Sequence, residues 1–322
     1  MTSAQATIQR LVAVEGSEDQ LAWEARQRTS AAAAALVAAL LTFVGTVWRG
    51  LALQDLPRTG LVESLDRATE PGRVAELESL KVQTFEHYHE QATGILLSSV
   101  LVAIGYIALG WALTYLAVAT RARRPAFRRW LVYLPLIAGT IQALATLLSS
   151  FATNSAVSDF LDGPRTVDAA QDVGTEGLSV FASLLGLPGA LGLALALIMI
   201  SLNAMSVGLL TRFLGVLGII TGALVFLPIG GPLPVVQSFW LLMLALLFSG
   251  RWPNGQPPAW RTGNAEPWPS SAQVREQRHR AAAERRGEVY EPEAPEPEPE
   301  PASVSAGPSP GASARKRKRK RR

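Results

Sequence analysis

The stretch Leu178–Gly250, LSVFASLLGLPGALGLALALIMISLNAMSVGLLTRFLGVLGIITGALVFLPIGGPLPVVQSFWLLMLALLFSG, decides the fold of this chain. It carries one charged residue, Arg212, and one short turn, Gly230-Gly231-Pro232. A soluble domain of ordinary size cannot enclose such a continuous block of Leu, Ile, Val and Phe, whereas a bilayer accepts it as three spanning segments. The sequence therefore predicts a membrane protein.

Further uncharged runs extend the pattern toward the N-terminus. Each is long enough to cross a hydrocarbon core of about 30 Å at about 1.5 Å per helical residue. Strict alternation of apolar and polar residues is absent, which favours helices over barrel strands. The predicted fold class is all-α, a polytopic bundle of six transmembrane helices with a disordered cytoplasmic tail. The predicted spans are residues 30–48, 94–119, 131–151, 178–202, 213–229 and 233–250.

Arginine marks the predicted inner ends of these helices. Arg212 stands in the tight turn after the fourth span, and five more stand in the short connection after the second: Arg121, Arg123, Arg124, Arg128 and Arg129. Short loops rich in Lys and Arg stay on the cytoplasmic side. The acidic loops 51–93 and 153–177 are predicted outside, where Trp48 and Arg49 close the first span as an interfacial aromatic and a snorkelling cation. Six spans then place both termini in the cytoplasm of a plasma-membrane protein.

The segments outside the spans differ in composition. Residues 1–29 are predicted as a cytoplasmic segment holding a short helix, and residues 71–91 as a helix leading into the second span. Residues 251–290 begin with Trp252, Trp260 and Trp268 among prolines, a strip expected in the headgroup region, followed by a short charged helix. Residues 291–322 join an acidic proline-rich stretch to a basic end, and are predicted to be disordered.

The composition limits the chemistry. There is no cysteine, so disulfides, thiolate nucleophiles and cysteine metal sites are excluded. The predicted spans hold no Asp, Glu, Lys or His, which argues against a pump. The most metal-like cluster is Glu86-His87-Tyr88-His89-Glu90, but two histidines two residues apart diverge on a helix. A structural role is favoured there over an external metal or proton-sensitive site. We expect no enzyme activity, catalytic residue, metal or cofactor.

Amides and small residues are the polar and packing features of the spans. Gln142, Asn203 and Gln237, with Pro188 as a helix-loosening residue, are the candidates for a polar pocket that takes a small or lipid-like ligand. The alternative is that each side chain only bonds a neighbouring helix. Gly218 and Gly222 form a GxxxG pair that predicts close helix packing.

The chain ends in eight consecutive basic residues. Near an anionic leaflet each contributes about 1 kcal/mol, so contact with anionic lipid headgroups is the favoured interpretation, as for the inner arginines. A cytoplasmic protein partner, self-association and contact with the acidic stretch are the alternatives, and nucleic acid is disfavoured because no aromatic residues interleave the charges. The residues are Arg315, Lys316, Arg317, Lys318, Arg319, Lys320, Arg321 and Arg322.

Part of the chain resembles a family of uncharacterised polytopic membrane proteins of actinobacterial type. The resemblance covers about residues 200–270 and is carried by six runs: Leu202–Met205, Gly208–Gly215, Pro232–Gln237, Phe239–Leu242, Gly250–Pro253 and Pro257–Trp260. It implies a multi-span bacterial membrane protein and no catalytic residue, substrate or cofactor.

The expected function is a structural or regulatory bundle whose cytoplasmic tail contacts anionic lipid or a protein partner. A transporter of a small molecule or lipid is the alternative, using the polar pocket candidates. An intramembrane enzyme comes third, because the spans hold no Ser–Lys pair, paired Asp or histidine-rich metal set.

Overall fold

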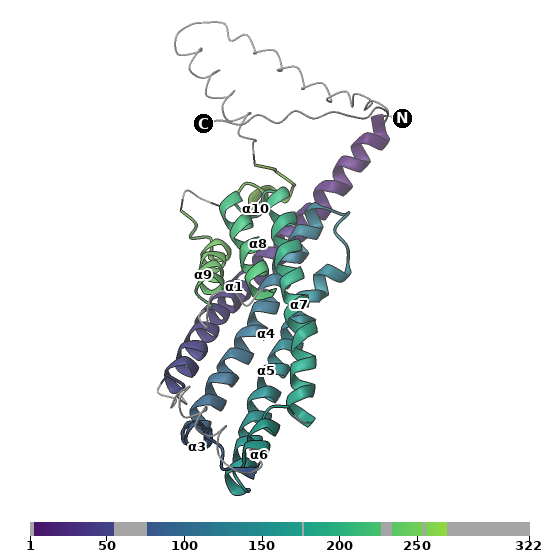
Figure 1. Cartoon of the computed structure of the whole chain (residues 1–322). Coiled ribbons are helices and arrows are strands. Elements are labelled where there is room, and N and C mark those ends of the chain that lie inside the picture. The colour runs from purple at the N-terminus through teal and green to yellow at the C-terminus, as the bar shows by residue number, and fades with distance from the viewer. Residues whose placement is uncertain (1–2, 55–75, 176, 227–233, 254–255, 269–322) are drawn as a thin grey trace, which may run out of the picture. The chain divides into compact units, whose positions relative to one another are not determined.

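A computed structural model describes residues 3–54, 76–175, 177–226, 234–253 and 256–268, with side chains from residue 18 onward. Regular structure in these ranges is helical, apart from one isolated bridge. Four helices are long and apolar enough to cross a membrane, within Glu18–Ala52, Ala92–Arg123, Trp130–Asp162 and Val167–Ser206. The helices (Figure 1) are α1 (Ser3–Ala52), α3 (Val82–Glu90), α4 (Ala92–Arg123), α5 (Trp130–Asp162), α6 (Val167–Asp172), α7 (Gly177–Ser206), α8 (Arg212–Phe226), α9 (Val235–Ser249) and α10 (Ala259–Thr262). The predicted all-α membrane class is confirmed at this level.

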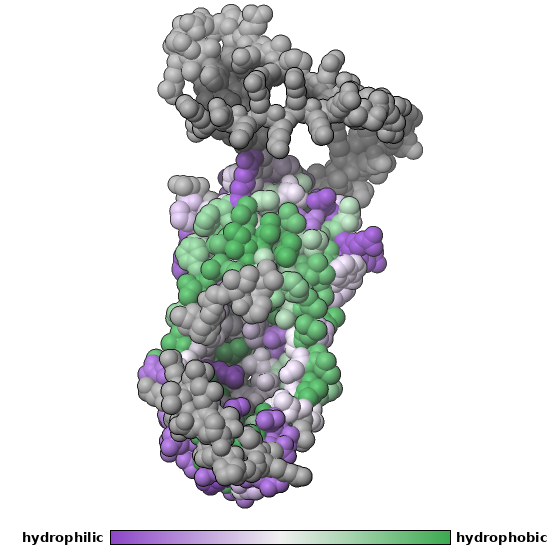
Figure 2. All heavy atoms as spheres, in the orientation of Figure 1, coloured by the Kyte–Doolittle hydropathy of each residue, from purple (hydrophilic) through white to green (hydrophobic). Residues whose placement is uncertain are grey.

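The surface of the long helices is that of a protein surrounded by lipid. Ile137 is 57% exposed and Leu187 is 60% exposed, and every long helix carries several such side chains. Figure 2 shows hydrophobic residues gathered over the middle of the molecule, broken by a hollow with hydrophilic residues inside it. A monomeric soluble protein rarely exposes apolar patches of this extent.

The six-span count is not confirmed. α8 and α9 have 15 residues each, which corresponds to roughly 22 Å per helix. A hydrocarbon core of about 30 Å is longer than that. The predicted turn at Gly230-Gly231-Pro232 lies outside the described residues, so the last two crossings stay a prediction.

The helices are arranged as a ring of antiparallel neighbours. α1 packs against α4 and α9, α5 against α4 and α7, and α8 against α7 and α9, while α4 and α7, which run in the same direction, share a smaller contact. The connections that carry Arg121–Arg129 and Arg212 lie with α10 at one end of the bundle, and α3 and α6 lie at the other (Figure 1). We call these the basic end and the acidic end.

Small residues let the helix backbones approach closely. A Cβ added to Gly139 of α5 would lie 2.6 Å from the Tyr106 carbonyl oxygen of α4, and one added to Gly110 would lie 2.7 Å from the Pro135 carbonyl oxygen. Helices in lipid associate through such close packing, since burying apolar surface gains little there.

One stripe of α1 runs the length of the bundle. Its members follow at alternating steps of four and three residues, which is the spacing of a coiled-coil seam. Glu24 and the members from Ala31 to Gly45 are buried, and the two arginines, Arg28 and Arg49, are half-buried. The stripe consists of Glu24, Arg28, Ala31, Ala35, Ala38, Thr42, Gly45 and Arg49. α1 therefore crosses the predicted boundary at residue 29 without a break.

The acidic end joins the two long loops. Ser79 N donates to the Arg165 carbonyl oxygen at 2.8 Å, and Val167 N donates to the Leu77 carbonyl oxygen at 2.9 Å. These bonds hold the chain extended around Glu78, where it bridges Thr166. The predicted helix over 71–91 is therefore wrong for its described part up to Lys81, and α3 begins only at Val82.

Candidate functional site

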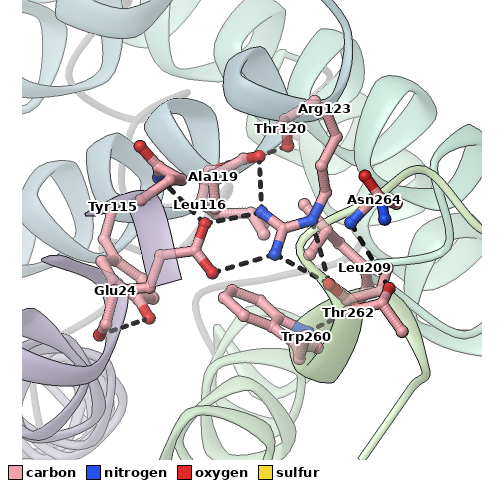
Figure 3. A network of polar contacts seen from close by, with 12 residues as sticks. Glu24, Tyr115, Leu116, Ala119, Thr120, Arg123, Leu209, Trp260, Thr262 and Asn264 are labelled. Carbon is pink, nitrogen blue, oxygen red and sulfur yellow. Dashed lines mark hydrogen bonds and ion pairs between the residues drawn. The ribbon is translucent and has the colours of Figure 1, made fainter. Parts of the chain in front are cut away.

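The basic end encloses an ion pair between α1 and α4. Arg123 Nη1 lies 2.6 Å from Glu24 Oε1, and Nη2 lies 2.9 Å from Oε2 (Figure 3). The exposed fractions of the two side chains are 0% and 4%. A bidentate pair of this kind is strong and fixes the relative orientation of its partners. It therefore fixes the register of α1 against α4.

Every N–H of the Arg123 guanidinium has an acceptor inside the protein. Two donate to Glu24, one to the Ala119 carbonyl oxygen at 2.9 Å, and Nε and Nη2 donate to the Ala259 carbonyl oxygen at 3.1 and 2.8 Å. An arginine has five N–H donors. No N–H of Arg123 is left to bind a ligand. The geometry is therefore that of a structural contact between helices and not of a substrate site.

Aromatic rings surround the pair. The Trp260 ring stacks on Tyr115 with centroids 5.8 Å apart, and the Arg123 guanidinium carbon lies 5.5 Å from the Trp260 ring centre. Tyr115 Oη donates to the Glu24 carbonyl oxygen at 3.2 Å. Tyr115 and Arg123 are eight residues apart on α4, so they share one face of that helix. We refer to Glu24, Tyr115, Arg123, Ala259 and Trp260 as the Arg123 cluster.

The segment after α9 folds back onto the basic end. Trp260 Nε1 donates to the Leu209 carbonyl oxygen at 2.9 Å, and Trp268 Nε1 donates to the Leu210 carbonyl oxygen at 2.8 Å. Leu209 and Leu210 are both buried in the connection between α7 and α8, where a backbone carbonyl needs a hydrogen-bond partner, and the indoles supply it. Both indoles therefore bind the bundle itself, and their position in the headgroup region stays a prediction.

Gly208 lets this segment come close. It has φ +80°, a conformation that favours glycine, and an added Cβ would meet the Glu266 carbonyl oxygen. Glu266 N donates to the Val207 carbonyl oxygen at 3.1 Å. The backbone around residue 266 therefore lies directly against the connection between α7 and α8.

The other predicted arginines differ from Arg123. Arg128 and Arg129 are exposed, Arg121 is half-buried, and Arg124 donates to Ser206 Oγ at 3.0 Å. Arg212 is exposed and donates to the Trp268 carbonyl oxygen at 3.5 Å. The lipid-contact prediction is wrong for Arg123, because burial in the cluster removes it from lipid. The predicted tail residues Arg315–Arg322 lie outside the described residues.

The polar pocket candidates do not share a pocket. Asn203 lies three residues before the end of α7 and donates to the Met199 carbonyl oxygen of its own helix at 2.7 Å. Gln237 is buried near the start of α9. It lies twelve residues before Ser249, where α9 ends at the basic end, which corresponds to roughly 18 Å along the helix. The two therefore lie at different depths. Gln142 faces Gly189 of α7, and Pro188 is exposed.

Gly218 and Gly222 lie at the contact of α8 with α7. A Cβ on Gly222 would lie 2.9 Å from the Ala194 carbonyl oxygen, and one on Gly218 would meet the Ser201 hydroxyl. Trp240 of α9 packs on the same site and donates to the Leu214 carbonyl oxygen at 2.9 Å. The GxxxG pair thus holds the α8–α9 hairpin on the bundle.

The acidic end holds the histidine cluster. Glu86 pairs with Arg165 at 3.3 Å, and His89 Nδ1 lies 3.4 Å from Ser158 Oγ. Burial raises the pKa of the Tyr88 phenol above 10.0, and the positive charge of Arg49 acts in the opposite direction. Within the described ranges, no three His, Asp or Glu side chains converge on a position for a metal ion.

Comparison of the chain with family models, curated proteins and solved structures gave no match. The support for a function therefore comes from the sequence and from the geometry of the site.

Two features of the site have a signal in the sequence beyond those described above. Glu24 and Arg28 continue the alternating spacing of the buried alanines of α1, which indicates that this face packs inside the bundle. Tyr115 and Arg123 likewise share one face of α4. The contribution of Ala259 had no signal, since a backbone carbonyl is present at every residue.

Proposed function

We propose that this protein is a membrane scaffold that fixes the root of a charged cytoplasmic tail to a rigid bundle. The observation that supports it most is the saturated guanidinium of Arg123, which ties α1, α4 and Ala259 together. The compact unit formed by the bundle ends at Trp268, and the residues from Pro269 form a separate unit. The tail therefore leaves from a point that is held in place.

The proposed target of the tail is an anionic lipid surface. The eight basic residues Arg315–Arg322 supply the attraction, which is of order 1 kcal/mol per residue close to an anionic leaflet. A protein partner or self-association of tails is the alternative outcome. The transport alternative gains no support from Gln142, Asn203, Gln237 and Pro188, since they lie in separate places.

The tail prediction is tested with the full chain in neutral nanodiscs, mixed with anionic vesicles. Replacing Arg315–Arg322 by glutamine removes eight charges and keeps the length. We expect vesicle binding at low salt to fall more than tenfold, because about 1 kcal/mol per residue exceeds a factor of ten after two residues. Equal binding by the two proteins would exclude lipid contact through this segment. The control is replacement of the exposed Arg128 and Arg129, which should have a smaller effect.

The proposed topology is a plasma-membrane bundle of six crossings with both termini in the cytoplasm. The positive charge at the basic end supports this orientation. It agrees with the bacterial source that the resemblance implies.

The absence of cysteine makes the topology directly testable. On intact cells we expect an impermeant maleimide to label Thr175→Cys and Gly231→Cys, and to label Arg128→Cys only after permeabilisation. These positions represent the acidic end, the predicted outer turn and the basic end. The reverse pattern for residues 175 and 128 would contradict the orientation. Protection of residue 231 under both conditions would reduce the count to four crossings.

A further inference from the structure

A second arginine, Arg49, lies in a groove near the acidic end. The groove has a volume of about 250 Å³ and lies between α5 and α7 at the end of α1. Its polar lining consists of Arg49, Gln142, Thr146, Ser149 and Ser183, and no acidic residue lines it. Arg49 lies 25 residues beyond Glu24 on α1, roughly 37 Å along the helix. The groove is thus far from the Arg123 cluster.

Arg49 belongs to the face of α1 that packs inside the bundle. It follows Thr42 and Gly45 at the spacing of the buried stripe, and a Cβ on Gly45 would lie 2.7 Å from Val102 of α4. Arg49, predicted as a snorkelling cation, is half-buried in the groove, because this face of α1 is directed toward α4 and the groove.

The donors of the groove are not used by the protein. The half-buried Arg49 guanidinium makes no hydrogen bond or ion pair with any residue that the structure describes, in contrast to Arg123. Gln142 Oε1 is enclosed without a partner against Gly189, and Gln142 Nε2 makes no hydrogen bond with any residue that the structure describes. The exposed Ser149 hydroxyl is also open. A half-buried charge without a counter-charge is costly, and an anion would compensate it.

The remaining hydroxyls are held in place. Thr146 Oγ1 donates to the Gln142 carbonyl oxygen at 2.8 Å, and Ser183 Oγ donates to the Ser179 carbonyl oxygen at 2.9 Å. Their protons are used, so they line the groove without competing for Arg49. The donors that remain without a partner belong to Arg49, Gln142 and Ser149. Three such donors suit a ligand with several hydrogen-bond acceptors.

We propose that this groove binds a phosphate or carboxylate group, with Arg49 as the charged donor and Gln142 and Ser149 as neutral donors. Bonds from an arginine to such anions are charge-assisted and about twice as strong as neutral ones. The volume lies just below the range of about 300 to 1,000 Å³ that accommodates drug-sized ligands, so it suits a headgroup or a small anion. An anionic lipid of the adjoining leaflet and a soluble anion share this chemistry.

The test uses Ser149→Cys, which keeps a weaker S–H donor at this position beside Arg49 and Gln142, as the single cysteine of the full chain, labelled from outside by an impermeant maleimide. Three vesicle preparations are compared: phosphatidylcholine alone, equal parts phosphatidylcholine and phosphatidylglycerol, and phosphatidylcholine with added inorganic phosphate. A bound anion covers residue 149 and slows labelling by about tenfold at ten times its Kd. Slowing by phosphatidylglycerol identifies a lipid headgroup, and slowing by phosphate identifies a soluble anion. Either result supports the site.

Matched variants exclude effects of the vesicle surface. Ser155→Cys is exposed on the same helix outside the groove, and its labelling rate should change much less. Arg49→Gln should abolish the protection of residue 149, Arg49→Lys should retain part of it, and Gln142→Leu should weaken it. If the rates at 149 and 155 change equally in every preparation, or if protection survives Arg49→Gln, the proposal is overturned. Gln142→Leu serves as the second variant if Arg49→Gln does not fold.

Discussion

Arg123→Ala is expected to destabilise the bundle by about 3 to 5 kcal/mol, because it leaves the buried Glu24 carboxylate without its partner. The carboxylate would keep the bond from Gln20 Nε2 at 2.9 Å, which does not replace a charge. The measurement is the free energy of unfolding of the purified chain in mixed micelles. A loss below about 1 kcal/mol would show that the pair does not fix α1 on α4.

A double variant distinguishes the cost of an unpaired buried charge from the contribution of the ion pair itself. Glu24→Leu with Arg123→Met removes both charges and should recover most of the loss, because apolar replacement of a whole buried pair is often neutral. The Ala259 carbonyl oxygen would still accept from Gly263 N at 3.2 Å, so no backbone group is left unpaired there. The matched control is Arg128→Ala at an exposed position, with an expected change within about 0.5 kcal/mol. A double variant as unstable as the single one would contradict this account.

Trp260→Ala is expected to cost about 3 kcal/mol and to release the segment after α9 from the basic end. The indole is half-buried and stacks on Tyr115, so the lower end of the range for Trp to Ala applies. Release is measured with Ala259→Cys, since Ala259 is 0% exposed in the native structure. Its labelling by a maleimide should become at least ten times faster, because about 1.4 kcal/mol already shifts the open fraction tenfold.

Two further tryptophan variants show whether the loss of stability and the faster labelling come from the Trp260 indole itself. Trp260→Phe keeps a ring and removes the donor to Leu209, so we expect a loss of about 1 to 3 kcal/mol from the unpaired carbonyl. Trp130→Ala removes an indole that is 48% exposed and should leave the labelling of residue 259 unchanged. Slow labelling in Trp260→Ala would mean that Arg123 and Trp268 hold the segment without this indole.

The scaffold proposal and the groove proposal fail separately. The first depends on contacts at the basic end and on the tail, and the second on Arg49 and Gln142 at the other end of the bundle. We expect the tail variant to lose vesicle binding without any change in the labelling rate of residue 149.

Much of the fold was predictable from the sequence. The uncharged runs gave the long helices, because apolar character adds up along neighbouring residues and each helix satisfies its own backbone in lipid. Boundaries were less accurate. α5 continues to Asp162, well past the predicted end at residue 151, and α1 passes through residue 29. Polarity marks where a span leaves the membrane, while the helix itself continues as long as its backbone bonds are made.

The sequence by itself determined the membrane class, the helical bundle and the basic end. Only the tertiary structure decided what each arginine does. Arg123 and Arg49 have the same donors, but Arg123 meets Glu24 and Ala259, which are 99 and 136 residues away, and Arg49 meets no acid in its groove. Hydropathy is a local sum that the sequence contains directly. The partner of a hydrogen-bond donor depends on which distant atoms the fold places within about 3 Å of it, and packing alone settles that.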